Sequence, residues 1–295
     1  MRKAFILTLV ILLTAFAAKS AAQTANCDYW RSDSVKVVRL LAEAARTDQG
    51  TNYMTWFARR LCGLPYVAKT LEKNDNERLV VNLRQMDCTT YVETVLALAR
   101  CANQHKRSFA DFCNNLRLIR YEQGKVAYAC RLHYFTYWIL ENARKQWIRD
   151  VAQDGPPFTA VQTVKVNYMT THTEQYPMLV KHPEWVEHIR GMEDSISGQH
   201  YRYIPKTQLA DSRLLRNTIH DGDIIVILTS KKGLDTSHIG IASWHADGLH
   251  MLNASMVHHK VVEESLLLAD YMARHPSQTG IRIVRPTFQI SQQTK

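Results

Sequence analysis

A change of periodicity near residue 221 constrains the fold of this chain more than any other feature. Before it, apolar residues recur at helical spacing over 32–46, from about 88 onward, and through 109–147. After it, the pattern alternates as in β-strands, and we predict strands over 223–229, 238–244, 249–255, 257–263 and 281–285. Short turns such as Asp247-Gly248 favour antiparallel pairing. The sequence therefore predicts an α+β domain whose C-terminal antiparallel sheet packs against the helix that starts near Cys88.

The segment between the helices and the strands has a different composition. Pro156-Pro157, Pro183 and Pro205 interrupt short apolar pieces over 154–205. Long ordered loops of this kind are usually functional. We therefore predict a single domain over 23–295 that carries an insertion of helices and loops at about 101–215.

The first 22 residues have the three parts of a secretory signal. Arg2 and Lys3 precede an apolar run over 4–18, and Ser20-Ala21-Ala22 supplies small residues before a cleavage site. A membrane anchor is the alternative, but the run is short and wrongly flanked for a stable span. We predict a protein that is secreted across the inner membrane into the periplasm, without stable membrane insertion after the signal is removed.

The chain is basic, and removal of Arg2, Lys3 and Lys19 lowers its formal charge from +10 to +7. A basic protein favours an anionic partner. Nucleic acid is not the expected partner, because the basic residues are scattered among acidic ones and an exported protein seldom meets nucleic acid. Peptidoglycan, whose peptides carry carboxylates, fits both the charge and the compartment.

Cysteine and histidine usage argues against two other kinds of site. The six cysteines are too few and too irregularly spaced for a disulfide scaffold, although one or two disulfides fit an oxidising periplasm. The sequence alone does not pair them. The 13 histidines include no His-Glu-x-x-His arrangement, and we expect neither a metal nor an organic cofactor.

Cys88 is the candidate nucleophile. It stands at the predicted start of a helix, where unpaired N–H groups and the helix dipole stabilise a thiolate. Polar residues surround it in the segment Asp87-Cys88-Thr89-Thr90-Tyr91-Val92-Glu93, before the apolar face of the helix begins. The alternative is a buried structural cysteine or a half-cystine, and the other five cysteines fit that description better.

His238 is the candidate general base. It belongs to Ser237-His238-Ile239-Gly240-Ile241-Ala242, whose alternation puts His238, Gly240 and Ala242 on one face of a strand. The small residues that follow His238 are expected to leave room for the helix that brings the thiol to the imidazole. The alternative is a histidine at a strand end whose ring is satisfied by the backbone.

Asn253 is the candidate residue that orients the base. It lies on the next predicted strand, and pairing through the turn at Asp247-Gly248 brings it beside His238. An amide oxygen accepts a hydrogen bond from the imidazole and fixes its tautomer without adding charge. His250 and Ser255 are the rival orienting residues.

Further segments accompany these residues in a fixed order across most of the chain. They are Gly63-Leu64-Pro65-Tyr66-Val67 with Leu71-Glu72, Leu79-Val80-Val81-Asn82-Leu83 leading to the Cys88 segment, Arg131-Leu132-His133-Tyr134-Phe135, Gly222-Asp223-Ile224-Ile225, Gly233-Leu234-Asp235-Thr236-Ser237-His238-Ile239-Gly240, and Asn253-Ala254-Ser255. In this order they resemble the NlpC-type, papain-like cysteine cell-wall hydrolases, and more closely their N-acetylmuramoyl-L-alanine amidase-like branch. Thr89-Thr90 stands where the broader superfamily has Ser-Gly, which favours that branch.

The resemblance implies a papain-like core in which N-terminal helices carry the cysteine and the C-terminal sheet carries the histidine. It implies hydrolysis of the amide between N-acetylmuramic acid and L-alanine in muropeptides, through an acyl-enzyme formed on Cys88 with His238 as base and Asn253 as orienting residue. It also places Tyr66 near the thiol, where the side chain could bind substrate or the oxyanion. Further candidate substrate-binding residues are Asp87, Thr89, Arg131, Tyr134 and Ser237.

Arg131 and the aromatic residues that follow it are candidates for holding glycan and peptide carboxylates, because arginine can bind a carboxylate with two hydrogen bonds. The loops over 154–205 are candidates for the same role. An aromatic stripe at helical spacing is, however, more often part of a core than of a binding surface.

Three alternatives to the amidase remain open at the level of sequence. An endopeptidase that cuts between D-glutamate and the diamino acid of the stem peptide uses the same three residues, and specificity resides in loops. A catalytically silent wall-binding module would carry Cys88 away from His238. A zinc amidase needs three protein ligands in tight geometry. We expect a monomer in each case.

Overall fold

The computed structural model describes residues 27–210 and 213–288, and the predicted signal segment 1–22 lies outside them. The α-helices are α2 (Arg31–Ala44), α3 (Tyr53–Arg60), α4 (Cys88–Asn103), α5 (Phe109–Arg120), α6 (Phe135–Arg144), α7 (Tyr168–Thr171), α8 (Pro177–Lys181), α9 (Val186–Ile196), α10 (Arg213–Thr218) and α11 (Leu268–Ala273). The strands are β1 (Cys27–Asp28), β2 (Leu79–Val80), β3 (Ile148–Asp150), β4 (Ala160–Thr163), β5 (His200–Pro205), β6 (Ile224–Thr229), β7 (Thr236–Trp244), β8 (Leu249–Ser255), β9 (Lys260–Glu263) and β10 (Gln278–Pro286).

The main sheet is antiparallel and has the order β4-β5-β10-β6-β7-β8-β9, with β3 also paired to β10. This confirms the predicted α+β class and the antiparallel C-terminal sheet. Strand β8 occupies the predicted range 249–255. Strand β9 begins at Lys260 rather than at 257, because residues 256–259 form the turn that precedes it. Strands β3, β4 and β5 lie inside the expected insertion and were not predicted.

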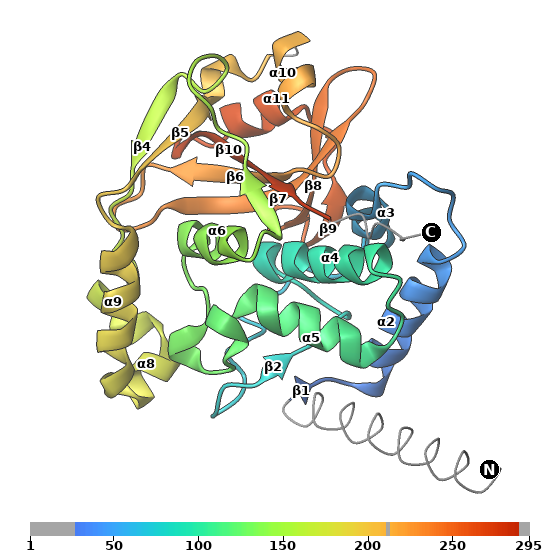
Figure 1. Ribbon diagram of the computed structural model, residues 1–295. Helices are drawn as coiled ribbons and strands as arrows, with labels where there is room; N and C mark the ends of the chain where they lie inside the picture. The colour runs from blue at the N-terminus through green and yellow to red at the C-terminus, as the bar shows by residue number, and fades with distance from the viewer. Residues whose placement is uncertain (1–26, 211–212, 289–295) are drawn as a thin grey trace, which may run out of the picture.

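Helices cover both faces of the main sheet (Figure 1). Alternate residues of β6 point to opposite faces of the sheet. Ile224 and Val226 join the core between the sheet and α4, and Ile225 and Ile227 join the core between the sheet and α11. The second core is closed by Leu268 and other residues of the short helix α11. Strand β6 is therefore buried on both faces, which explains its unbroken apolar sequence.

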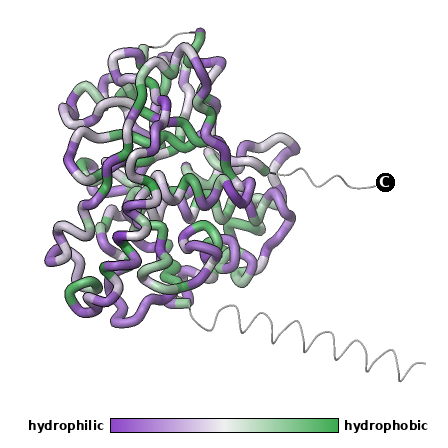
Figure 2. Tube along the Cα trace, turned by 60° about the vertical axis from the view of Figure 1, so that its left-hand side comes forward, coloured by the Kyte–Doolittle hydropathy of each residue, from purple (hydrophilic) through white to green (hydrophobic). Residues whose placement is uncertain are grey.

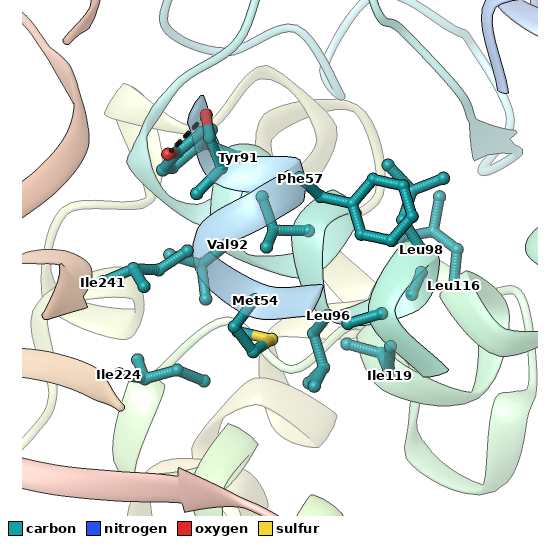
Figure 3. Close-up of a cluster of buried hydrophobic side chains, with 14 of the residues drawn as sticks. Met54, Phe57, Tyr91, Val92, Leu96, Leu98, Leu116, Ile119, Ile224 and Ile241 are labelled. Atoms are coloured by element: carbon teal, nitrogen blue, oxygen red, sulfur yellow. Dashed lines mark hydrogen bonds between the residues drawn. The ribbon is translucent and has the colours of Figure 1, made fainter. Parts of the chain in front are cut away.

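Helix α4 is the centre of the larger core. Every residue from Thr90 to Cys101 is buried, and the helix packs against α2, α3 and α5 as well as against β7 and β8. Figure 3 shows this cluster, in which Val92 of the helix lies near Ile241 of the sheet. The Tyr91 hydroxyl is satisfied in the core because it donates to the carbonyl of Ala58 at 3.2 Å. The helix from Thr90 to Cys101 is thus held by packing on all sides.

The expected insertion at about 101–215 is not one separate unit. Helices α5 and α6 contribute Phe112, Leu116 and Trp138 to the central core, and β5 joins the main sheet. Within the described part of the insertion, a separate core forms around α7, α8 and α9, from residues such as Val164 and Ile189 together with Tyr128 and Tyr134. The difference arises because the apolar faces of α5 and α6 cover α4, a role that proline spacing alone does not reveal.

Hydrophobic segments gather in the interior of the molecule and hydrophilic segments lie mainly on its outer loops (Figure 2). Among the described residues, no helix combines the length and the apolar character needed to cross a bilayer. The thiols of Cys27 and Cys113, both buried, lie within hydrogen-bond range of each other between β1 and α5.

A buried ion pair joins α4 to α5. Arg120 Nε donates to Glu93 Oε2 at 2.6 Å, and Arg120 Nη1 donates to the carbonyl of Val80 at 2.7 Å. The two charged side chains are only 3% and 2% exposed. Burial raises the pKa of Glu93, and the neighbouring guanidinium opposes that rise. A buried carboxylate of this kind depends on its partner.

Arg120→Met should therefore lower the free energy of unfolding by about 3–5 kcal/mol, because it leaves the carboxylate of Glu93 buried without a cation. Urea denaturation followed by circular dichroism measures the loss. The double variant Glu93→Leu/Arg120→Met should recover part of it, since no unpaired charge remains. A loss below about 1 kcal/mol in the single variant would contradict the importance of this pair.

Candidate active site

Cys88 is the first residue of α4, and Asp87 is its N-cap. Asp87 Oδ1 accepts from the Thr90 backbone N–H at 2.9 Å, and Thr90 Oγ1 accepts from the Asp87 backbone N–H at 3.0 Å. This reciprocal arrangement is a capping box, which fixes where the helix begins. The predicted helix start is confirmed, and the thiol stands at that end of the helix.

The sulfur of Cys88 lies among hydrogen-bond donors. The backbone N–H groups of Ile239 and Thr89 and the Thr89 hydroxyl all donate toward it. Burial nevertheless raises the pKa of the thiol to about 12, and the nearby carboxylate of Asp87 adds to the rise. The expected lowering of this pKa by the helix start is thus outweighed, because the half-buried sulfur has lost the water that would stabilise a thiolate. The resting group is a neutral thiol.

His238 lies in β7, one residue before Ile239, whose N–H faces the sulfur. Its Nε2 is 3.0 Å from Asn253 Oδ1. Burial lowers the pKa of His238, while the hydrogen bond that it donates to Asn253 and the negative charge of Glu264 act in the opposite direction. The imidazole is therefore neutral at neutral pH. With its proton on Nε2, its Nδ1 carries a lone pair that can accept a proton.

The interpretation of Gly240 and Ala242 was wrong. A Cβ on Gly240 would lie 2.4 Å from Met251 Cγ, so the missing side chain makes room for a residue of the neighbouring strand β8. Ala242 and Met251 both belong to the core on the α11 side of the sheet. Helix α4 packs on the opposite face, where Ile239 and Ile241 lie. The thiol meets strand β7 at the backbone N–H of Ile239 because of where the helix begins, and not through a gap left by small residues.

Asn253 is fully buried, and both the oxygen and the nitrogen of its side-chain amide have hydrogen-bond partners. Its Oδ1 faces His238, and its Nδ2 donates to Glu264 Oε1 at 2.9 Å. The two rival orienting residues have other partners. His250 is bonded to the Glu264 carbonyl at 2.9 Å and to Asp247, and Ser255 Oγ accepts from the backbone of His258. Among these three residues, the structure directs Asn253 toward the imidazole.

Two tyrosines stand close to this group. Tyr66 is half-buried, and burial raises its pKa to about 12, with further contributions from Cys88 when it is ionised and from the carboxylate of Asp87. Tyr271 of α11 has its ring centroid 6.4 Å from that of His238, and burial raises its pKa to about 12 as well. Both hydroxyls are therefore neutral donors. Sequence reasoning missed Tyr271 because nothing in its surroundings marks it as polar or exposed.

A cavity of about 210 Å³ opens beside the helix start. Asp87 and Thr89, which flank Cys88, form part of its wall, together with Lys69, Arg131 and Tyr176. Tyr176 comes from the region between β4 and β5. The segment with the separate core thus contributes part of the wall of this cavity.

Arg131 is held by two carboxylates. It makes two hydrogen bonds to Glu77, at 3.0 and 2.6 Å, and a third to Glu72. Its side chain is 8% exposed. The guanidinium is therefore already paired and serves as part of the cavity wall, while Glu72 Oε2 is buried and has no partner among the described residues.

The hydroxyls of the remaining two predicted residues, Tyr134 and Ser237, are bonded to other parts of the protein. Tyr134 is buried in the separate core, where its hydroxyl donates to Glu193 Oε1 at 2.7 Å and accepts from the Met169 backbone. Ser237 is exposed, and its hydroxyl donates to the carbonyl of Ile227 at 3.3 Å. Within residues 27–210 and 213–288, no group of three or more His, Cys, Asp or Glu side chains is arranged to hold a metal ion.

The comparison with protein families gives a match over residues 56–281, to the family described as N-acetylmuramoyl-L-alanine amidase-like. The match spans the helix with Cys88 and the strands with His238 and Asn253. The chain belongs to the N-acetylmuramoyl-L-alanine amidase-like family. A comparison with curated proteins found no match.

Solved structures support membership of the amidase-like family. An N-acetylmuramoyl-L-alanine amidase from Bacteroides uniformis is 36% identical, with a TM-score of 0.75 over 81% of this chain and 100% of that one. A Bacteroides fragilis protein described as a candidate xylanase is 39% identical, with a TM-score of 0.72 over 77% and 98% of the two chains. A Legionella pneumophila protein shares the fold at 22% identity, with a TM-score of 0.68 over 86% and 94%.

Because the thiol and the imidazole both start neutral, we expect the alkylation rate of Cys88 to depend on pH. Below its pKa of about 12, the thiolate fraction of Cys88 rises with pH, so its alkylation by iodoacetamide should accelerate by about tenfold per pH unit from about pH 6 to 9. Peptide mass spectrometry measures the rate at Cys88 separately from the other cysteines. A rate that is already constant below about pH 7 would contradict the prediction, because it would reveal a preformed thiolate paired with an imidazolium.

Proposed function

We propose that this protein is a cysteine-dependent amidase that cleaves the bond between N-acetylmuramic acid and L-alanine in muropeptides, with Cys88 as nucleophile, His238 as general base and Asn253 as orienting residue. Membership of the amidase-like family supports hydrolysis of an amide in peptidoglycan. The observation that carries the residue assignment is the 3.0 Å contact between His238 and Asn253, one residue from the backbone N–H that faces the Cys88 sulfur. The core then corresponds to an NlpC-type, papain-like core.

The high pKa of the thiol defines the first step. His238 Nδ1 removes the proton as the sulfur of Cys88 attacks the carbonyl carbon of the lactyl group. Both groups start neutral, so the base is needed in every turnover. The imidazolium that forms is held by the Asn253 oxygen through Nε2–H.

The oxyanion of the tetrahedral intermediate needs donors at the helix start. The backbone N–H of Cys88, as the first residue of α4, has no intrahelical acceptor. We assign the oxyanion site to this N–H and to the Tyr66 hydroxyl, whose raised pKa keeps it protonated. His238 then protonates the nitrogen of L-alanine, the peptide leaves, and the thioester is hydrolysed by a water that His238 deprotonates.

The cavity beside Asp87 and Thr89 is the proposed substrate site. Its wall carries the cation of Lys69, which matches the carboxylates of a stem peptide. Arg131 keeps Glu72 and Glu77 in place rather than binding substrate directly. We further propose that residues 1–22 export the protein to the periplasm.

The xylanase description of the Bacteroides fragilis relative raises glycoside hydrolysis as a second chemistry. Glycosidases use two carboxyl groups that flank the glycosidic bond. Glu93 and Glu72 in the cavity wall are instead bonded to Arg120 and Arg131. Amide hydrolysis fits this arrangement better, and xylan serves as a control substrate.

Incubation of purified protein with defined muropeptides should release the intact stem peptide from the sugar, as detected by mass spectrometry. Cys88→Ala should abolish the release, with a loss of at least about 10³-fold, because it removes the nucleophile. Cys130→Ala is the matched control and should leave the rate unchanged, since Cys130 lies outside the cavity wall.

Other products would identify other functions. Cleavage inside the stem between D-glutamate and the diamino acid would replace the amidase with the endopeptidase. Product formation that survives in Cys88→Ala but stops with a chelator would indicate a metal-dependent reaction. No Cys88-dependent product from any muropeptide, combined with retained binding, would indicate a wall-binding module.

A further inference from the structure

A buried carboxylate lies directly behind the Asn253 amide. Glu264 Oε1 accepts from Asn253 Nδ2 at 2.9 Å, and Glu264 Oε2 is 3.1 Å from His258 Nε2. The Glu264 side chain is 2% exposed, whereas the His258 side chain is 45% exposed. A chain of hydrogen bonds therefore runs from His238 through Asn253 and Glu264 to a histidine at the surface.

The backbone around Glu264 holds this carboxylate in position. Glu264 follows β9 directly, its N–H donates to the Met251 carbonyl at 2.9 Å, and its own carbonyl is bonded to His250 Nδ1 at 2.9 Å. Both Met251 and His250 belong to β8, the strand that carries Asn253. Glu264 and Asn253 thus form one rigid unit.

We propose that Glu264 is a positioning residue of the active site, which acts through Asn253 to set the tautomer of His238 and to stabilise its protonated form. This inference rests on the proposed function, because it assigns a role within the same catalytic group. It adds a buried acidic residue to the three residues that the sequence resemblance supplied.

The first part of the argument concerns the orientation of the Asn253 amide. An ionised carboxylate only accepts hydrogen bonds, so Asn253 must present its NH₂ group to Glu264. Its Oδ1 must then face His238, and His238 must carry its proton on Nε2. The lone pair on Nδ1 is left to accept the proton of the thiol. Without an acceptor in this position, the amide can rotate and present a donor to the imidazole.

The second part concerns charge. A buried carboxylate adds little net stability even when it is hydrogen-bonded and paired, as Glu264 is with Asn253 and His258. A purely structural position would therefore be filled as well by a neutral residue. The negative charge of Glu264 raises the pKa of His238, against the effect of burial. The imidazolium formed when Cys88 loses its proton is therefore stabilised at the moment when it is needed. Asn253 keeps the carboxylate one residue away, so Glu264 does not take the proton itself.

Three variants separate charge from hydrogen bonding. Glu264→Gln keeps an acceptor for Asn253 and removes the charge, Glu264→Leu removes both, and Glu263→Gln is the matched control. Glu263 is the neighbouring residue but is bonded to Arg59, Ser243 and His245, away from Asn253. We expect kcat to fall by about 10-fold in Glu264→Gln and by about 100-fold in Glu264→Leu, with KM unchanged. Glu263→Gln should keep the full kcat.

A double-mutant cycle tests whether Glu264 acts through Asn253. In the Asn253→Ala background, Glu264→Gln should cause little further loss, because the connection to His238 is already cut. The alkylation rate of Cys88 at one neutral pH provides a second readout, which does not depend on the identity of the substrate. Thermal unfolding of each variant shows whether it is folded, and if Glu264→Leu fails to fold, Glu264→Gln decides the outcome.

Each outcome has one meaning. A coupled loss of kcat and of Cys88 alkylation in folded protein supports the proposal. Losses that add independently of Asn253, or folded Glu264 variants with unchanged kcat, would overturn it and leave Glu264 as a structural residue. Full activity in Cys88→Ala would overturn the proposed function instead, so the two failures are distinguishable.

Discussion

The enclosure of helix α4 on all sides is the constraint on which the rest of the structure depends. A helix whose residues from Thr90 to Cys101 are all buried needs neighbours around its whole circumference, and α2, α3, α5 and the sheet supply them. The end of such a helix cannot shift without disturbing every one of these contacts. The capping box at Asp87 then fixes the first turn, so Cys88 meets the backbone of Ile239 at a defined place. The precision of the site follows from the packing of the helix behind it.

The same packing disfavours the ionised form of Cys88. Burial that holds the helix end also removes water from the sulfur, and the pKa of Cys88 rises to about 12. The lowered pKa of His238 has the same origin. The thiol of Cys88 is therefore neutral at rest. In the mechanism that we propose, it is ionised only when a carbonyl group is positioned for attack. The carboxylate of Glu264 behind Asn253 offsets the low polarity of the surroundings at that step.

The sequence was sufficient wherever the signal is local. Alternation along β7 and β8 and the short turn between them predicted that Asn253 comes beside His238, and polar residues before an apolar face predicted the start of α4. Glu264 and Tyr271 could not be found in this way, because they reach the site through the path of the chain after β9 and not through a motif. Gly240 was misread for a related reason. A small residue indicates that another part of the chain packs closely against it. Only the sheet register shows that, for Gly240, this neighbour is Met251.

Arg131 shows how a residue that the sequence suggests as a substrate contact can have a structural role in the folded chain. An arginine near a candidate site suggests recognition of a carboxylate, but Glu72 and Glu77 occupy its guanidinium. Its removal would leave two carboxylates facing each other without a cation, so its first role is to keep the cavity wall intact. In the function that we propose, recognition of a carboxylate then falls to the cation of Lys69, which is also part of the cavity wall. Since Tyr176 in the cavity wall comes from the segment between β4 and β5, the size of the cavity depends on that segment, whereas the positions of Cys88, His238 and Asn253 depend on α4 and the sheet.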